Sequence, residues 1–290
     1  MQSKYNPGSL LDLLRSQEYK VTTYSEIKRT IESNRDLVGI PRGFSCAKLL
    51  RDFVSKGYIK RDSLNVGVRK ETRYILEDIS PYELALCVRP ASYLTHQTAA
   101  YINHLTERVS NTIFANSEQG SKEQSDSDLD QENIDNAFRS KQRISKSFIT
   151  YKRKTIRLLS GQYTDQLGVI QISYPEGTLV RCTDVERTLI DMTVRPAYAG
   201  GVAEVLSAYK HAHGRLSLQR LVDYLAKLAY KYPYHQAIGF YLTRSGNYTR
   251  EDLLLLSEIG MNFDFYLCHG IKRMRFDKTW RLHYPAELDT

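Results

Sequence analysis

The chain has 290 residues, of which 41% are hydrophobic, and it carries a formal net charge of +8 at pH 7. This length predicts roughly two domains, and the apolar content is sufficient for a packed core, which excludes a wholly disordered chain. No stretch is apolar enough for a signal peptide or a membrane-spanning helix. We therefore expect a cytoplasmic protein with no membrane partner.

The residues that usually hold metals or cofactors lack the spacing that such sites need. Four cysteines are scattered along the chain, at Cys46, Cys87, Cys182 and Cys268. They predict thiols of a reducing compartment rather than a disulfide framework or a zinc site. The seven histidines show no ligand spacing, and neither a Gly-rich phosphate loop nor a Gly-x-Ser-x-Gly elbow is present. We expect no metal, no cofactor and no enzymatic activity.

The charges are strongly segregated along the sequence. Nine lysines and arginines against three acids lie between Ile40 and Arg73, and eight bases without an acid lie between Asn136 and Thr164. The segment from Glu118 to Asp135 instead carries seven acids and one lysine. Segregation on this scale favours a polyanionic partner.

The first eighty residues show the element order of a winged helix-turn-helix. Capping boxes and apolar spacing predict three helices, followed by two strands around a basic loop. In chain order we expect helices over Ser9–Gln17, from Thr23 onward and over Ser45–Lys56, a turn region over Asn34–Phe44, and strands over Tyr58–Arg61 and Thr72–Leu76 on either side of the loop Asp62–Glu71. Gly57 stands where a helix-ending glycine belongs. This order predicts a DNA-binding domain over residues 1–80.

The helix over Ser45–Lys56 is the strongest functional candidate. Its apolar positions leave a polar side outward, with Lys48 and Arg51 at its centre. In a recognition helix such side chains read base edges in the major groove, while basic residues of the following hairpin contact phosphates. The candidate DNA-binding residues are Arg42, Ser45, Lys48, Arg51, Ser55, Lys60, Arg61, Arg69, Lys70 and Arg73. An ordinary solvated helix and a protein-binding winged module remain open as alternatives.

Residues 81–290 are expected to form a larger mixed α/β domain, so that the whole chain is α+β. Ser80–Glu83 is a strong helix start, with a Ser cap followed by Pro and then Glu. The expected elements are a helix over Tyr93–Leu105, a strand over Thr112–Ala115, strands within Ile144–Leu159 and Gly168–Val180, helices between Thr183 and Lys231, helices capped by Ser217 and Thr249, and a closing strand over Met274–Tyr284. The acidic segment at about 117–138 predicts a mobile insert.

A second basic surface is expected after the acidic insert. Its candidate residues are Lys141, Arg143, Lys146, Lys152, Arg153 and Lys154. They could bind nucleic acid or dock an acidic protein, and they could equally neutralise the acidic insert across a hairpin. Charge alone does not separate these alternatives.

The stretch Arg181–Asp191 combines carboxylates with arginines. It predicts a helix start, with Thr183 as the N-cap, Glu186 completing a capping box, and Asp184 at the positive end of the helix dipole. The alternative is a metal-dependent enzyme that cleaves DNA or modifies nucleotides with Asp184, Glu186 and Asp191. A capping role for Glu186 occupies one of these carboxylates and favours the helix start.

Three segments resemble one protein family. Thr183–Asp191, followed by Arg195–Gly201, resembles the hallmark of AbiEi-type antitoxins of type IV toxin–antitoxin systems. Tyr93–Ala100 is similar to the family's Tyr-x-(Ser/Thr)-His-x-(Ser/Thr)-Ala helix, and Phe276–Leu282 also fits. The motif residues, to which we assign structural roles, are Thr183, Asp184, Glu186, Arg187, Asp191, Gly200 and Gly201.

The resemblance implies a bacterial antitoxin of a phage-defence system. Its N-terminal domain would bind double-stranded DNA at its own promoter and repress the operon, cooperatively on inverted repeats, as a monomer or weak dimer in solution. Its C-terminal domain would counter a cognate nucleotidyltransferase-like toxin, and members of the family are not enzymes. A stand-alone transcription regulator without a toxin partner stays open, because only a neighbouring nucleotidyltransferase gene would separate the two.

Overall fold

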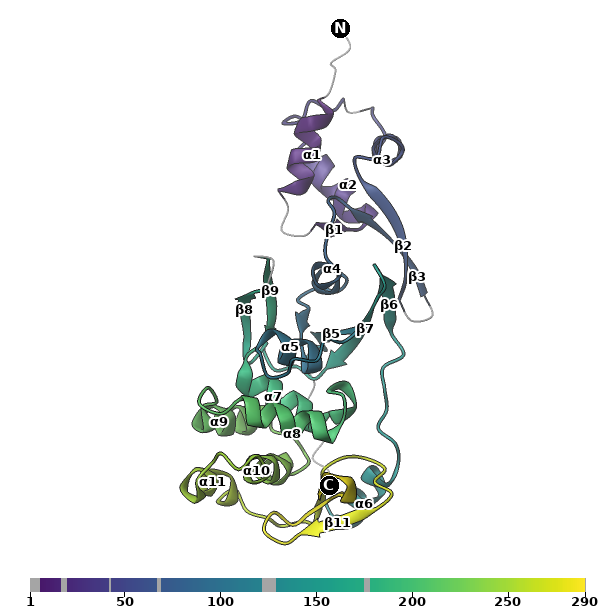
Figure 1. Ribbon diagram of the computed structural model, residues 1–290. Helices are drawn as coiled ribbons and strands as arrows, with labels where there is room; N and C mark the ends of the chain where they lie inside the picture. Colours follow the sequence, from purple (N-terminus) through teal and green to yellow (C-terminus); the bar gives the residue numbers. More distant parts are fainter. Residues whose placement is uncertain are drawn as a thin grey trace.

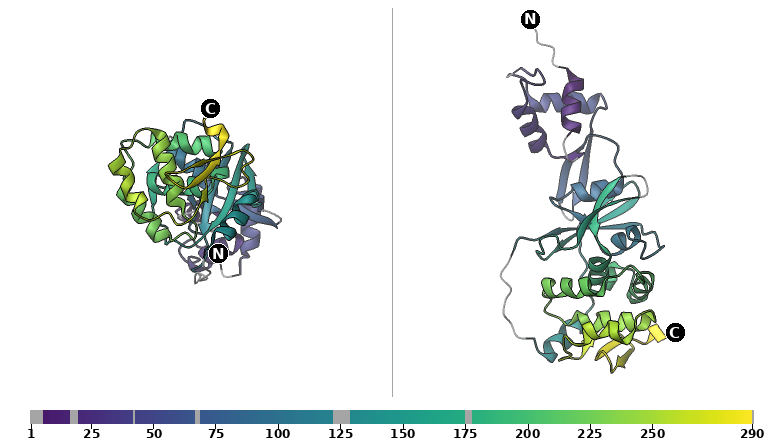
Figure 2. Two further views of the ribbon diagram at one scale, coloured as in Figure 1. Left: turned by 90° about the horizontal axis from the view of Figure 1, so that it is seen from below. Right: turned by 90° about the vertical axis from the view of Figure 1, so that its left-hand side faces the viewer.

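The structure is a computed structural model that describes residues 6–16, 20–41, 43–66, 69–121, 129–174 and 178–289. Over these residues the chain forms eleven α-helices and three sheets, which agrees with the predicted α+β class. The molecule is elongated, with the N-terminal helices at one end, a six-stranded sheet in the middle and helices with a small C-terminal sheet at the other end (Figures 1 and 2). None of the described helices is long and apolar enough to cross a membrane.

Three helices and a hairpin form the N-terminal end. The elements are α1 (Pro7–Arg15), β1 (Val21–Thr22), α2 (Tyr24–Ser33), α3 (Cys46–Ser55), β2 (Lys60–Val66) and β3 (Arg69–Ile75). The strands pair antiparallel in the order β1-β3-β2. Leu10, Ile27, Leu49 and Phe53 are fully buried in one apolar cluster, so the inner faces of α1, α2 and α3 pack against each other.

The predicted starts of these helices are partly right. Thr23 and Glu26 form the expected capping box of α2. The first helix, however, starts before Ser9, because the Asn6 side chain accepts a hydrogen bond from the Gly8 N–H at 2.9 Å and Pro7 occupies the first helical position. Asn is among the best N-cap residues and Pro is favoured at that position.

The hairpin is longer than the sequence predicts. Its two strands are paired from Lys60 opposite Ile75 to Val66 opposite Arg69. Most of the predicted loop over Asp62–Glu71 is therefore strand. Pairing between the two strands overrides the low intrinsic strand propensity of the polar residues in this segment. Figure 1 shows the hairpin extending from the end of α3 towards β6 (Phe148–Tyr151).

The central sheet has six strands in the order β6-β7-β5-β4-β9-β8. The other strands are β4 (Tyr93–Leu94), β5 (Thr112–Glu118), β7 (Lys154–Gly161), β8 (Val169–Ser173) and β9 (Leu179–Thr183). The pairs β4–β9 and β5–β7 are parallel, and the other pairs are antiparallel. Two helices accompany it, α4 (Pro81–Cys87), which begins with the predicted Ser80 capping box, and α5 (His96–Ile102).

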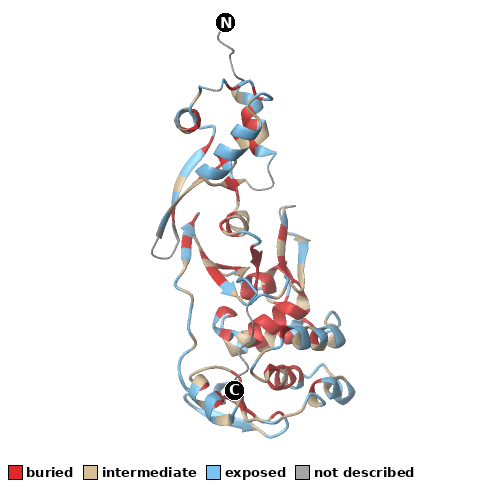
Figure 3. Ribbon diagram, turned by 180° about the vertical axis from the view of Figure 1, so that it is seen from behind, coloured by how far each residue is buried: buried red, intermediate tan, exposed pale blue. Residues whose placement is uncertain are grey.

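Helices cover the side of this sheet away from the N-terminal elements (Figure 1). They are α7 (Val185–Val194), the short 3₁₀ helix η1 (Pro196–Tyr198), α8 (Val202–His211), α9 (Leu218–Leu228), α10 (Tyr234–Ser245) and α11 (Arg250–Ser257). Ser217 and Thr249 cap α9 and α11, as predicted. Buried residues are concentrated in α5, α7 and α10 (Figure 3). No helix was predicted over α10, because this helix is buried on nearly every side and so lacks an amphipathic period.

The predicted closing strand is two strands around a turn. The C-terminal sheet has the order β10-β12-β11, from β10 (Phe265–Tyr266), β11 (Met274–Asp277) and β12 (Leu282–Pro285), and a 3₁₀ helix η2 (Ala286–Asp289) follows. Trp280 lies in the turn between β11 and β12 and is buried. The alternation of Trp280 with Leu282 therefore reflects burial of a turn residue and not a continuous strand.

The acidic insert is more ordered than predicted. Within about 117–138, β5 continues to Glu118 and a helix α6 (Gln131–Arg139) begins at Asp130, while residues 122–128 lie outside the described residues. Ile134 and Phe138 of α6 are buried in the C-terminal core. These two residues are four positions apart and follow the N-cap Asp130, which is a pattern typical of a helix. The helix was not predicted because the segment is highly polar.

Apolar contacts cross the predicted domain boundary at residue 80. Val21, Leu64 and Ile75 belong to the same buried cluster as Leu84 and Ile149. One side of the N-terminal hairpin therefore packs on the central sheet. The division into residues 1–80 and 81–290 stays a prediction.

Candidate functional site

The outer face of α3 carries exposed polar and basic side chains. Ser45, Lys48, Arg51 and Ser55 are exposed, whereas the inward positions of the same helix are buried. The Lys48 ammonium lies 5.7 Å from the centroid of the Phe44 ring, and the Arg51 Nε atom is 3.4 Å from the carbonyl oxygen of Ala47. Neither side chain makes an ion pair with an acid in the described part of the chain, so both charges face solvent.

The hairpin presents a smaller basic surface than the sequence predicts. Arg61 and Lys70 are exposed. Lys60 is also exposed, but its Nζ atom pairs with Asp62 at 3.5 Å. Arg73 is turned inward: only 14% of its side chain is exposed, and it pairs with Glu71 at 2.6 Å. That ion pair occupies the Arg73 guanidinium and withdraws it from a role in phosphate binding.

Two predicted DNA-binding side chains cannot be placed. Arg42 lies outside the described residues, and so does the side chain of Arg69, although the backbone of Arg69 pairs with Val66 at the end of the hairpin. The described basic surface of this end of the molecule therefore consists of α3 with the exposed cations of the hairpin.

The second basic run divides into two groups at opposite ends of β6. Lys141, Arg143 and Lys146 lie on the extended segment between α6 and β6, whereas Lys152, Arg153 and Lys154 form the start of β7 and the turn before it. Lys152 pairs with Asp78 at 2.6 Å, and Lys154 donates to the carbonyl oxygen of Ser110 at 2.9 Å. The predicted residues therefore lie in two groups on either side of β6, and a role for them as one surface stays a prediction.

The helix start predicted at Thr183 is shifted by one residue. The N-cap of α7 is Asp184, whose side chain accepts from the Arg187 N–H at 2.8 Å and from the Tyr224 hydroxyl at 2.8 Å. Thr183 is instead the last residue of β9, and its hydroxyl bonds to Thr188 at 2.8 Å. Burial raises the pKa of Asp184, and the two donated hydrogen bonds oppose that rise.

Glu186 joins two helices instead of completing a capping box. Because the cap is Asp184, Glu186 falls at the second helical position, where it cannot reach back to the cap N–H. Its side chain is 2% exposed. It accepts from the Ser217 N–H at 2.8 Å, at the start of α9, and lies 3.5 Å from the Arg220 guanidinium. This carboxylate therefore ties α7 to α9.

The two motif glycines shape the entry to α8. Gly200 and Gly201 have φ angles of +87° and +104°, a region that other residues rarely adopt. Gly201 is the N-cap of α8. These positions need glycine for the backbone, which agrees with the structural role expected for them.

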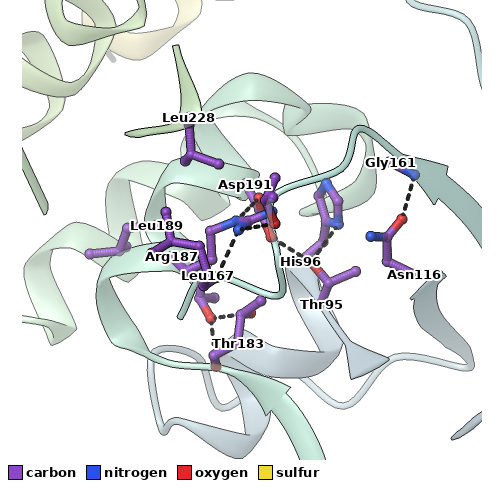
Figure 4. A network of polar contacts seen from close by, with 12 residues as sticks. Thr95, His96, Asn116, Gly161, Leu167, Thr183, Arg187, Leu189, Asp191 and Leu228 are labelled. Atoms are coloured by element: carbon purple, nitrogen blue, oxygen red, sulfur yellow. Dashed lines mark hydrogen bonds and ion pairs between the residues drawn. The ribbon is translucent and has the colours of Figure 1, made fainter. Parts of the chain in front are cut away.

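An ion pair between Arg187 and Asp191 lies at the centre of the motif (Figure 4). The Arg187 Nε atom donates to Asp191 Oδ1 at 2.9 Å, and the two side chains are 5% and 9% exposed. The other carboxylate oxygen accepts from the Thr95 hydroxyl at 2.7 Å, while Arg187 Nη1 donates to the Leu167 carbonyl oxygen at 2.8 Å. Burial alone would lower the pKa of Arg187, but the Asp191 carboxylate raises it, so the guanidinium stays charged.

His96 stands beside this pair in a strained backbone conformation. Its φ is +52°, although it is the first residue of α5, and its side chain is buried. Its Nδ1 atom lies 3.1 Å from the Thr95 hydroxyl, and its ring packs edge-on against Tyr198 with centroids 5.2 Å apart. Strain in a non-glycine residue often marks a functional position. Burial lowers the pKa of His96 to about 4, so the ring is neutral at pH 7.

These motif residues line a cavity of about 670 Å³. Its wall includes Thr95 and His96 at the start of α5, Arg187 and Asp191 from α7, and Tyr198 from η1. The spacing of the histidines gave no reason to expect a functional role for His96, and neither Thr95 nor Tyr198 was among the candidate residues. The signal that could have found them is their position inside the two segments that carry the family resemblance.

The three carboxylates of the enzyme alternative are each used by the protein. Asp184 caps α7, Glu186 binds the start of α9, and Asp191 pairs with Arg187. Over the described ranges no group of three or more His, Cys, Asp or Glu residues is arranged to hold a metal ion. Their geometry therefore gives no support to a shared metal site.

The pH dependence of stability should report the burial of His96. Between its folded pKa of about 4 and the ordinary value of 6.5, the unfolded chain binds a proton that the folded chain does not. The free energy of unfolding therefore falls as the pH falls through this window, by about 3 kcal/mol over its full width. In thermal unfolding, the melting temperature of the wild type should fall more between pH 7 and pH 5 than that of His96→Gln. The exposed His211→Gln variant is the control, and equal losses in all three proteins would contradict the prediction.

Comparison with known proteins shows the fold and no more. No protein-family model matches the chain, and no curated protein matches it. Among solved structures it is similar to the Rv2827c protein from Mycobacterium tuberculosis, with a TM-score of 0.57 and 13% identity. The match covers 97% of this chain and 93% of that chain. The two proteins therefore share an overall fold across almost their whole lengths.

Proposed function

We propose that this protein is an AbiEi-type antitoxin that binds and represses its own promoter and counters a nucleotidyltransferase-like toxin. The observation that carries the DNA-binding half is the outer face of α3. Its buried side packs on α1 and α2, and it leaves Lys48 and Arg51 in solvent without an acidic partner among the described residues. The element order α1-β1-α2-α3-β2-β3 supports a winged helix-turn-helix.

The exposed cations suit a nucleic-acid duplex. Lys48 and Arg51 stand three residues apart on one helix, so they project from the same side. In a major groove such side chains favour guanine edges, and exposed hairpin residues such as Arg61 and Lys70 suit the phosphates beside it. Because the hairpin packs on the central sheet, we assign most of the proposed sequence recognition to α3.

The antitoxin half rests on the resemblance of the two motif segments. Thr95, in the first segment, donates to Asp191, in the second, across 96 residues of sequence. Arg195 and Tyr198, in the Arg195–Gly201 part of the second segment, line the same cavity as Thr95. Contact between both segments supports their being one motif, as the family resemblance requires.

One variant can separate the two activities. The full-length Lys48→Ala/Arg51→Ala protein should bind its promoter at least tenfold more weakly than the wild type, because each substitution removes a contact to a base or a phosphate. Fluorescence anisotropy with the promoter duplex, repeated over a range of salt, measures the loss. Each lost phosphate contact should also flatten the log–log salt dependence by about 0.9. The same variant should still rescue cells that express the neighbouring toxin.

Lys227→Ala, an exposed change on α9, is the matched control and should leave both activities intact. Unchanged promoter affinity in the double variant would exclude α3 as the recognition helix. Rescue that disappears together with promoter binding would contradict the division of labour. Wild-type protein that binds its promoter but never rescues cells would favour a stand-alone transcription regulator.

A further inference from the structure

The cavity beside the Arg187–Asp191 pair is electropositive. Arg143, Arg187, Arg195 and Lys231 line it, and Asp191 is the only acid among its lining residues. Because Asp191 accepts from Arg187 at 2.9 Å, its charge is already balanced inside the protein. Arg143 and Arg195 therefore contribute unbalanced positive charge to the cavity, and this charge attracts an anion.

Two arginines, Arg143 and Arg195, lie next to each other in the lining of this cavity. Arg195 follows the last turn of α7, and its Nη1 atom lies 3.4 Å from the carbonyl oxygen of Arg143. Both residues are exposed, and neither forms an ion pair with an acid in the described ranges. Neither positive charge is balanced by an acid there, so both can attract an anion. Arginine forks match the geometry of phosphate oxygens, which makes phosphate the favoured anion.

Aromatic rings form another part of the wall. Tyr198, Tyr230, Tyr232 and Tyr234 all line the cavity. The Tyr198 ring packs at right angles to the ring of His96, which is neutral at pH 7 and adds no charge. Tyrosine faces stack with flat heterocycles in a way that tolerates different bases. The wall thus offers an aromatic surface within the same space as the two arginines.

We propose that this cavity binds a nucleoside phosphate, with the phosphates at Arg143 and Arg195 and the base among the tyrosines. A volume of about 670 Å³ is suited to a small molecule of this size. The strained His96 and the buried Arg187–Asp191 pair make the inner wall rigid, which reduces the entropy lost on binding. The site is separate from the α3 surface and does not depend on DNA binding.

Calorimetric titration of the full-length protein tests this assignment. The probes are the four ribonucleoside monophosphates and triphosphates, with pyrophosphate and unphosphorylated adenosine as the partial ligands. We expect saturable 1:1 binding of at least one nucleotide, and at least tenfold weaker binding of pyrophosphate and of adenosine. Arg195→Ala and Arg143→Ala should each weaken nucleotide binding at least tenfold.

Two control variants locate the binding site. Arg250→Ala removes an exposed arginine from the start of α11, outside the cavity lining, and should bind nucleotide like the wild type. Lys48→Ala/Arg51→Ala should also bind nucleotide like the wild type, although its affinity for DNA is reduced. Thermal unfolding of each variant confirms that it is folded. Three results would each overturn the proposal. They are the absence of saturable nucleotide binding, binding of pyrophosphate as tight as that of the nucleotides, and an equal loss of nucleotide affinity in Arg250→Ala and Arg195→Ala.

Discussion

Replacing Asp191 with leucine is expected to lower the free energy of unfolding by about 3–5 kcal/mol. The change leaves the Arg187 guanidinium, which is 5% exposed, without the carboxylate that balances its charge. It also removes the acceptor of the Thr95 hydroxyl. Urea unfolding of the wild type and the variant measures the difference.

The exposed Lys28–Glu32 pair supplies the control, because it has the same four-residue spacing on a helix but lies in solvent. Glu32→Gln should cost no more than about 0.5 kcal/mol. The Arg187→Leu/Asp191→Leu double variant should recover part of the loss, since it leaves no unpaired buried charge. A cost for Asp191→Leu similar to that of Glu32→Gln would show that the pair does not hold α7 to the chain around it.

Gly239→Ala is expected to destabilise the protein by about 3 kcal/mol, because it overpacks the core. Helix propensity alone predicts the opposite, a gain of nearly 1 kcal/mol for alanine inside a helix. Gly239 lies in α10, and an added Cβ would overlap the ring of Trp280. That ring is held in place, because its Nε1 atom donates to the Thr243 hydroxyl at 2.8 Å and its side chain is buried.

Thermal unfolding of three variants checks this prediction. At Gly43 an added Cβ meets no atom within 4 Å, so Gly43→Ala should change the melting temperature little. Trp280→Phe removes part of the large ring. The melting temperature of the Gly239→Ala/Trp280→Phe protein should therefore fall by less than the sum of the falls in the two single variants. A melting temperature of Gly239→Ala equal to or above that of the wild type would contradict the packing argument.

Elements that depend on neighbours a few residues away were predicted well. The capping boxes at Thr23 and Ser80 and the caps at Ser217 and Thr249 all begin helices where expected. The amphipathic pattern of α3 also places its buried and exposed faces correctly. These signals work because a cap or a helix face is formed within three or four residues of chain.

Elements whose stability comes from distant partners were missed. α6 lies within a polar, acidic segment, yet the side-chain amide of Gln131 donates to the carbonyl oxygen of Asp264 at 2.8 Å and Phe138 stacks on His269. The start of α7 was predicted one residue too early, because threonine is also a good N-cap residue. Only the pairing of β9 shows that Thr183 belongs to the strand and that Asp184 is the cap. Tertiary contacts override local preference in both cases.

The sequence by itself determined the α+β class, the basic face of α3 and most helix starts, because these depend on composition and on residues close together in the chain. Only the tertiary structure decided that Glu186 ties α7 to α9, that Arg73 is withdrawn into an ion pair, and that Thr95 meets Asp191. The physical reason is the sheet order. Parallel pairing of β4 with β9 brings the starts of α5 and α7 together, and no local pattern encodes that pairing.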